Sequence, residues 1–97
     1  AAKHGVIGLV RSLAIDLSGT GVTANAIAPG STRTAILEAS AASYGIDIAE
    51  FATHQRPIGR LVEPEEIAAA VAYLCSPGAA AVTGVVLPVD GGMTSTI

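Results

Sequence analysis

The chain has very few aromatic residues: one Phe, two Tyr and no Trp among 97 residues. Hydrophobic residues nevertheless make up 51% of it. A core would therefore be built from Ala, Val, Ile and Leu, which is typical of closely packed α/β layers. The length is sufficient for one small domain with a modest core.

Positive charge, cysteine and long apolar runs are also scarce. Five Lys and Arg stand against eight Asp and Glu, which argues against a nucleic-acid surface. No apolar run approaches the ~18 residues of a spanning helix, so we expect no membrane segment. The single cysteine, Cys75, excludes an internal disulfide and favours a cytoplasmic location. His4 and His54 have no partners at metal-ligand spacing, so we expect no metal site.

Residues 2–18 have the periodicity of an amphipathic helix. Its apolar stripe consists of Val6, Leu9, Val10, Leu13 and Leu17. A second stripe is small: Gly5, Gly8 and Ser12. Because glycine in a helix costs about 1 kcal/mol relative to Ala, this stripe predicts close packing against another backbone. No capping residue precedes the pattern, so we expect further residues before Ala1.

Two segments read as strands. Residues 22–28 are uncharged and small or β-branched, which predicts a strand buried on both faces. Residues 85–89 form a second strand, which Pro88 places at a sheet edge or a bulge. The helix between them begins at Glu63-Pro64-Glu65-Glu66 and ends at residues 76–78. This order predicts a parallel βαβ crossover.

Residues 35–56 form a long insertion between the first strand and the main helix. We expect one short helix over residues 36–43 and another over roughly 48–55, with Asp47 and Glu50 as a capping box. Insertions of this kind are often lids, and Tyr44 is a candidate substrate contact in it.

The first strand ends at Pro29-Gly30 and opens into the polar loop Ser31-Thr32-Arg33-Thr34. In open α/β sheets ligands bind outside the carboxyl ends of the strands, and glycine lets backbone approach a ligand closely. The alternative interpretation is a simple strand-to-helix turn in which Thr34 caps the next helix. Asn25 is more readily explained as a structural amide, Cys75 as a small core residue, and Arg60 and Glu63 as residues that fix a loop.

Several segments together resemble the short-chain dehydrogenase/reductase family, in its 3-oxoacyl-carrier-protein-reductase-like branch. Ala2-Lys3-His4-Gly5-Val6-Ile7-Gly8-Leu9 resembles the end of the family's Tyr-x-x-x-Lys motif. Other matching segments, in the family's order, are residues 22–34, 57–60, 63–68, 83–84 and 89–92. Each is weak alone, but the ordered set is specific and covers essentially the whole chain.

The resemblance implies an α/β fold: the C-terminal part of a Rossmann-type doubly wound parallel sheet, with residues 1–97 as one portion of a single NAD(P)-binding domain. It also implies an oxidoreductase that transfers hydride between NAD or NADP and a carbonyl/alcohol substrate, as a homotetramer or dimer. The family's glycine-rich loop, catalytic serine and tyrosine do not occur in these residues. The isolated chain is therefore predicted to be inactive. Strands that should lie beside residues 22–28 are also lacking, so the chain is predicted not to fold stably as a monomer.

The resemblance assigns site residues as well. Lys3 would be catalytic, since it would lower the pKa of a tyrosine four residues earlier, before Ala1, and would bind the cofactor ribose. Pro29, Gly30, Thr32 and Thr34 would bind the nicotinamide end. The alternative is a non-catalytic assembly or binding module that uses the small helix face and the strand at 85–89. The encoded sequence upstream of Ala1 distinguishes the two hypotheses.

Overall fold

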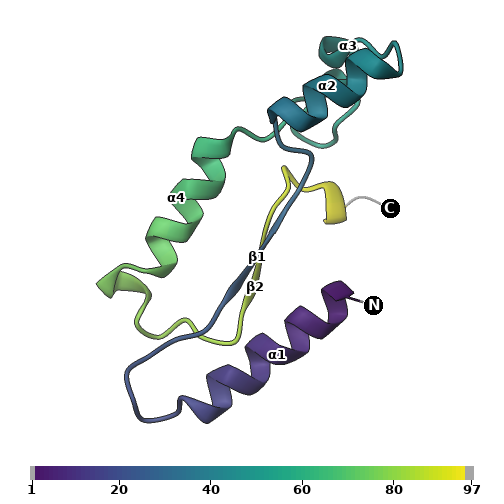
Figure 1. Cartoon of the computed structure of the whole chain (residues 1–97). Helices are drawn as coiled ribbons and strands as arrows, with labels where there is room; N and C mark the ends of the chain where they lie inside the picture. The colour runs from purple at the N-terminus through teal and green to yellow at the C-terminus, as the bar shows by residue number, and fades with distance from the viewer. Residues whose placement is uncertain (1, 96–97) are drawn as a thin grey trace. The chain divides into compact units, whose positions relative to one another are not determined.

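The computed structural model describes residues 2–95, which form two compact units. One unit comprises residues 2–28 and 69–87, and the other comprises residues 29–68 and 88–95. Figure 1 labels the elements: α1 (Ala2–Asp16), β1 (Ala26–Pro29), α2 (Ala35–Ser43), α3 (Ile48–Thr53), α4 (Pro64–Leu74) and β2 (Val86–Val89). Short 3-10 turns cover Pro77–Ala79 and Met93–Ser95.

β1 and β2 form a two-stranded parallel sheet. The N–H of Ala26 donates to the carbonyl of Val85 and that of Gly30 to the carbonyl of Val89. In both bonds the acceptor lies 59 residues further along the chain, and a constant offset is the signature of parallel pairing. Since α4 lies between the two strands in the sequence, the predicted parallel βαβ unit is confirmed.

The first strand is shorter than predicted, because the side chain of Asn25 replaces part of the backbone ladder. Its Nδ2 donates to the Val82 carbonyl at 3.0 Å, and its Oδ1 accepts from the Val85 N–H at 3.1 Å. Asn25 is thus a satisfied structural amide, as expected. The prediction of a strand buried on both faces is wrong for these residues: Ala26 to Ala28 are half-buried, since among residues 2–95 only β2 pairs with β1 and the other edge of β1 is open.

The helix α1 ends at Asp16, two residues before the predicted end, and Gly19 and Gly21 follow at φ 79° and 80°. Its apolar stripe is largely uncovered, with Val6 55% and Leu9 59% exposed. Nothing lies within 4 Å of a Cβ built at Gly5 or Gly8. No described element therefore supplies the close backbone contact that the small stripe predicts.

The second unit contains a small core at Leu61 and Val62, which are 0% and 4% exposed, together with Ala41 and Ala52. The two predicted helices of the insertion are present as α2 and α3, and they pack against each other. The Asp47 carboxylate caps α3 by accepting from the N–H of Ala49, rather than from that of Glu50 as a capping box would require.

Cys75 differs from its predicted place. It lies directly after the last residue of α4 and is exposed, so the expectation of a core position is wrong. The physical reason is that no element among residues 2–95 covers that end of α4. The described part of the chain also has no helix with the length and apolarity needed to span a bilayer.

Candidate functional site

The loop that follows β1 begins with a close backbone contact. A Cβ built on Gly30 would lie 2.7 Å from the Cα of Asp90 and 2.8 Å from its Cβ. No Cβ is tolerated at such distances, so the approach of the residue after β2 requires glycine here. The sequence predicted a close approach at Gly30 to a ligand, and the structure identifies Asp90 as a partner that needs the same space.

A single parallel bridge between Thr32 and Val62 orients the middle of the loop. The N–H of Arg33 donates to the Val62 carbonyl at 2.8 Å, and the N–H of Val62 donates to the Ser31 carbonyl at 2.9 Å. In this pattern the N–H and C=O of Thr32 itself are directed away from Val62. The loop therefore presents one backbone donor and one backbone acceptor from the same residue.

Thr34 caps α2: its hydroxyl oxygen accepts from the N–H of Leu37 at 3.1 Å. The alternative interpretation of residues 29–34 as a strand-to-helix turn with a Thr34 cap is therefore correct as a description of local structure. A hydroxyl has two lone pairs and one proton, so the capping bond leaves that proton free to be donated to a ligand. The two interpretations are compatible.

Arg33 ties the loop to the residue before α4. Its Nε donates to Glu63 Oε1 at 3.0 Å, while its Nη1 lies 3.8 Å from Glu38 Oε1. The sequence singled out Glu63 as a residue that fixes a loop, and this contact identifies its partner. The residue type of Arg33 gave no indication that it would form the contact.

Arg60 pairs with Glu66 at the start of α4. Two hydrogen bonds join the guanidinium to the carboxylate, at 2.6 and 3.0 Å. The same carboxylate accepts from the backbone N–H of Glu63 at 2.9 Å, which caps α4. The Arg60 hydrogen bonds, followed by the one from Glu63, lower the pKa of Glu66 to about 2. The same bond with Glu66 raises the pKa of Arg60.

The turn after β2 is built around Asp90. Its carboxylate accepts from the Thr94 hydroxyl at 2.7 Å, from the Gly92 N–H at 2.9 Å and from the Thr94 N–H at 3.2 Å. The Thr94 hydroxyl is the largest of the causes that lower the pKa of Asp90. Gly92 has φ 86°, and a Cβ there would lie 2.6 Å from Cδ of Pro57. The turn is therefore closely fitted to the segment after α3.

Lys3 lies in the first turn of α1 and is exposed. It belongs to the first unit, whereas residues 29–34 belong to the second. Among residues 2–95 no acidic side chain forms an ion pair with it. The position four residues before Lys3, where the resemblance requires a tyrosine, lies outside the described residues. His4 and His54 are both exposed, and no three potential ligands gather for a metal within residues 2–95.

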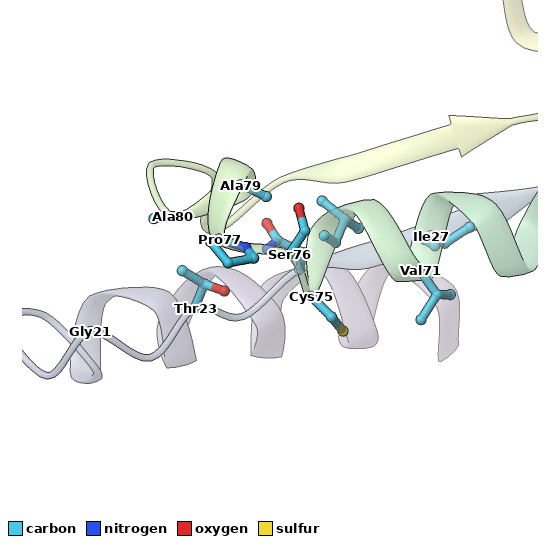
Figure 2. Close-up of a pocket in the computed structure, with 11 residues that line it drawn as sticks. Gly21, Thr23, Ile27, Val71, Cys75, Ser76, Pro77, Ala79 and Ala80 are labelled. Carbon is cyan, nitrogen blue, oxygen red and sulfur yellow. The ribbon is translucent and has the colours of Figure 1, made fainter.

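A cavity of about 650 Å³ lies within the first unit. Figure 2 shows that its walls come from β1 and the segment before it, from α4 and from the turn that follows α4. The Asn25 amide in its wall is already bonded to backbone, and no charged side chain lines it. The lining residues are Gly21, Thr23, Asn25, Ile27, Val71, Leu74, Cys75, Ser76, Pro77, Ala79 and Ala80. No His, Asp, Glu, Lys or Tyr side chain lies in these walls.

A smaller groove, of about 90 Å³, lies on α2 and α3 in the second unit. Its exposed walls are entirely apolar, and Tyr44, which is 80% exposed, contributes to them. The other lining residues are Leu37, Ser40, Ala41, Ile46, Ile48 and Phe51.

Comparison with known proteins identifies the family. Residues 1–94 match the family described as enoyl-(acyl carrier protein) reductase. The chain belongs to the short-chain dehydrogenase/reductase family. It is 45% identical to a putative ketoacyl reductase of Streptomyces coelicolor over 96% of this chain and 38% of that protein. It is 48% identical to the 3-oxoacyl-(acyl-carrier-protein) reductase FabG of Vibrio cholerae, over 96% of this chain and 36% of that protein.

Solved structures of this family have the same α/β Rossmann-type fold. An actinorhodin polyketide ketoreductase with NADPH superposes with a TM-score of 0.84 at 39% identity, over 97% of this chain and 39% of that one. A C-terminal deletion mutant of Thermoplasma acidophilum aldohexose dehydrogenase gives a TM-score of 0.89 at 34% identity, over 97% and 44%. The chain thus spans less than half the length of these short-chain dehydrogenases/reductases.

Proposed function

We propose that this chain is part of an NAD(P)-dependent oxidoreductase that interconverts the carbonyl and alcohol forms of a small molecule. The observation that carries the proposal is the backbone N–H and C=O of Thr32 in the loop after β1, which are directed away from Val62. The names of its relatives, which include a ketoacyl reductase and a 3-oxoacyl-(acyl-carrier-protein) reductase, support this class of reaction. We further propose a cytoplasmic homo-oligomer, either a dimer or a tetramer.

The loop fits the nicotinamide carboxamide of NAD or NADP. A primary carboxamide has one carbonyl acceptor and two N–H donors. The Thr32 N–H and C=O complement that set, and the Thr34 hydroxyl can donate a further bond. Pro29 and Gly30 bring the loop to the carboxyl end of β1, where ligands of such folds bind. When bound, the dinucleotide supplies or accepts the hydride.

Lys3 is proposed to support proton transfer at the substrate oxygen. A tyrosine four residues earlier on the same helix would lie on the same face as Lys3. An ammonium group beside a phenol favours the phenolate and so lowers the pKa of the phenol from about 10 towards neutrality. The tyrosine could then exchange its proton with the substrate oxygen. Lys3 is also proposed to donate hydrogen bonds to the ribose hydroxyls.

The insertion at residues 35–56 is proposed to be the substrate lid of the single domain to which residues 1–97 would contribute. It starts directly after the nicotinamide loop, since Thr34 is the cap of α2. Its apolar groove, with Tyr44 exposed, suits an apolar part of the substrate.

The test is reduction of a ketone or β-ketoacyl thioester by the complete gene product, followed by the ultraviolet absorbance of NADH or NADPH. We expect Lys3→Met to lower kcat/KM by about 10²- to 10⁴-fold, the range for general acid–base catalysis. Arg11→Met removes a positive charge from the same helix and is expected to leave kcat/KM near the wild-type value. A folded gene product that neither binds nor oxidises NADH or NADPH contradicts the proposal.

The second candidate is a non-catalytic assembly module, which the exposed apolar stripe of α1 favours. This hypothesis predicts an oligomer that binds no dinucleotide. It also predicts that the gene encodes no tyrosine four residues before Lys3.

A further inference from the structure

Two consecutive residues, Val62 and Glu63, hold the loop after β1. Val62 binds its backbone through the Ser31 carbonyl and the Arg33 N–H. Glu63 binds a side chain of the loop: its carboxylate accepts from Arg33 Nε at 3.0 Å. Because both attachments reach residues adjacent to Thr32, they restrict rotation of the peptide groups of Thr32.

Glu63 is itself held in place. Its backbone N–H donates to Glu66 Oε1 at 2.9 Å, and Arg60 fixes that carboxylate with two hydrogen bonds. Contacts therefore run from the first turn of α4, through the Glu63 backbone and side chain, to Arg33. The Arg33–Glu63 pair joins a charged donor to a charged acceptor at 3.0 Å, and its side chains are 41% and 39% exposed. The contact therefore sets the position of the Arg33 side chain more than it adds stability.

The competing partner of Arg33 lies on a different element. Glu38 is in α2, and its Oε1 is 3.8 Å from Arg33 Nη1. If Glu63 lost its charge, Glu38 would be the remaining partner of the guanidinium. The Arg33 side chain would then be held by Glu38 of α2 instead of by Glu63. Only the backbone bridge between Thr32 and Val62 would still orient the Thr32 peptide groups.

We propose that Glu63 is a positioning residue for nicotinamide binding, which acts through Arg33 to hold the N–H and C=O of Thr32 towards the carboxamide. This inference rests on the proposed function. It makes a selective prediction, because Glu63 should affect the nicotinamide half of the dinucleotide and not the adenosine half.

The test measures two affinities on the complete gene product: that of NADH or NADPH, and that of the matching ADP-ribose, which lacks nicotinamide. In Glu63→Gln we expect the reduced dinucleotide to bind about fivefold more weakly, while the affinity for ADP-ribose stays within about twofold of wild type. Glu65→Gln is the matched control, since it removes the same charge from the same helix end and Glu65 forms no ion pair among residues 2–95. The control should bind both ligands like the wild type.

Arg33→Gln and the double variant test the route through Arg33. If Glu63 acts through Arg33, the variant with both substitutions binds the dinucleotide no more weakly than the single variant with the lower affinity. Arg33→Gln also tests the contact independently should Glu63→Gln fail to fold. Unchanged dinucleotide affinity in both single variants, equal weakening of both ligands, or additive effects would overturn the inference while leaving the proposed function intact. A folded wild type that binds no NADH or NADPH would overturn both.

Discussion

The two units of the chain are stabilised in different ways. Residues 29–68 and 88–95 contain all three ion pairs found in the described chain, and four of its five buried apolar residues. Residues 2–28 and 69–87 contain one buried apolar residue, Ala79, and carry the exposed stripe of α1. The chain's own contacts thus preorganise the proposed nicotinamide loop, whereas the helix that carries Lys3 exposes the surface it would pack with.

The two halves of the proposed site depend on different surroundings. The loop at residues 30–34 has backbone, ion-pair and close-packing partners within its own unit, so single substitutions there should have local effects. Lys3 has no ion pair within residues 2–95, so its environment depends on what covers α1. Experiments on Lys3 therefore require the complete gene product.

The largest expected effect is on the fold of the isolated 97-residue chain. A two-stranded sheet is marginal in water, and large apolar side chains such as Leu9, Ile15 and Ile36 are mostly exposed. We expect no cooperative thermal transition of a monomer, measured by circular dichroism with sedimentation to establish the molecular mass. We also expect no oxidation of NADH or NADPH. A cooperative melt of the monomer would contradict the first expectation and would remove the contrast between the units.

A matched pair of glycine substitutions measures how differently the two units are packed. Gly30→Ala places a Cβ 2.7 Å from the Cα of Asp90, and the strain cannot be relieved by a rotamer change because the positions of both atoms are fixed by the backbone. We expect a loss of about 1–3 kcal/mol in the free energy of unfolding of the complete gene product. The measurement is urea denaturation, and an unchanged midpoint would show that the two strand ends can separate freely.

Gly5→Ala is the counterpart in α1, where nothing lies within 4 Å of the new Cβ. In a peptide covering residues 2–16 we expect higher helicity, since alanine is favoured over glycine by about 1 kcal/mol. In the complete gene product the small stripe predicts close packing, and the same substitution should then destabilise the protein or its oligomer. Stabilisation in both settings would mean that no backbone packs on this face.

Replacing Asn25, in the first unit, is expected to have a smaller effect on stability. Asn25→Ala leaves the Val82 carbonyl and the Val85 N–H without their side-chain partner. We expect the free energy of unfolding to fall by about 1–2 kcal/mol, because Asn25 is half-buried and water can partly replace its amide. Thr23→Ala, in the same segment, is the control and should lower the free energy of unfolding by less. Equal costs for the two variants would show that the amide bonds contribute little.

Much of the architecture was predictable from local sequence signals. The Glu-Pro-Glu-Glu start of α4, the apolar period of α1 and the β-branched run at residues 85–89 each determine an element without reference to the rest of the chain. The start of β1 was missed, since periodicity cannot show that the Asn25 amide would replace backbone hydrogen bonds. The exposure of Cys75 could not be predicted, because composition does not reveal which elements cover a helix end.

The candidate site was predictable only in part, because its long-range contacts leave no local signal in the sequence. Pro29, Gly30 and Thr34 follow from the strand end and the helix start, which are local. The contacts of Arg33 with Glu63 and of Gly30 with Asp90 join residues 30 and 60 positions apart. Pairings at that separation depend on the crossover bringing the strand ends together, and a single sequence does not specify them.

The smallest expected effect is a pH dependence in the second unit. Hydrogen bonds from Arg60 and from the Glu63 backbone lower the pKa of Glu66 from its ordinary value of 4.5 to about 2. A lowered pKa means that the folded state binds the proton less tightly than the unfolded chain. The stabilisation is therefore fully present above pH 4.5 and is lost as the pH falls from 4.5 to about 2.

Glu66→Gln should accordingly be less stable than the wild type above that window and should converge with it near pH 2. The difference should shrink in high salt, because the Arg60–Glu66 pair is partly exposed and screening weakens exposed pairs. Urea midpoints of the complete gene product measured across the window give the comparison, with Glu65→Gln as the control expected to follow the wild-type curve. A gap between Glu66→Gln and wild type that widens as the pH falls would reverse the sign of the linkage, and the Arg60–Glu66–Glu63 contacts could not then be what anchors Glu63 beside the loop.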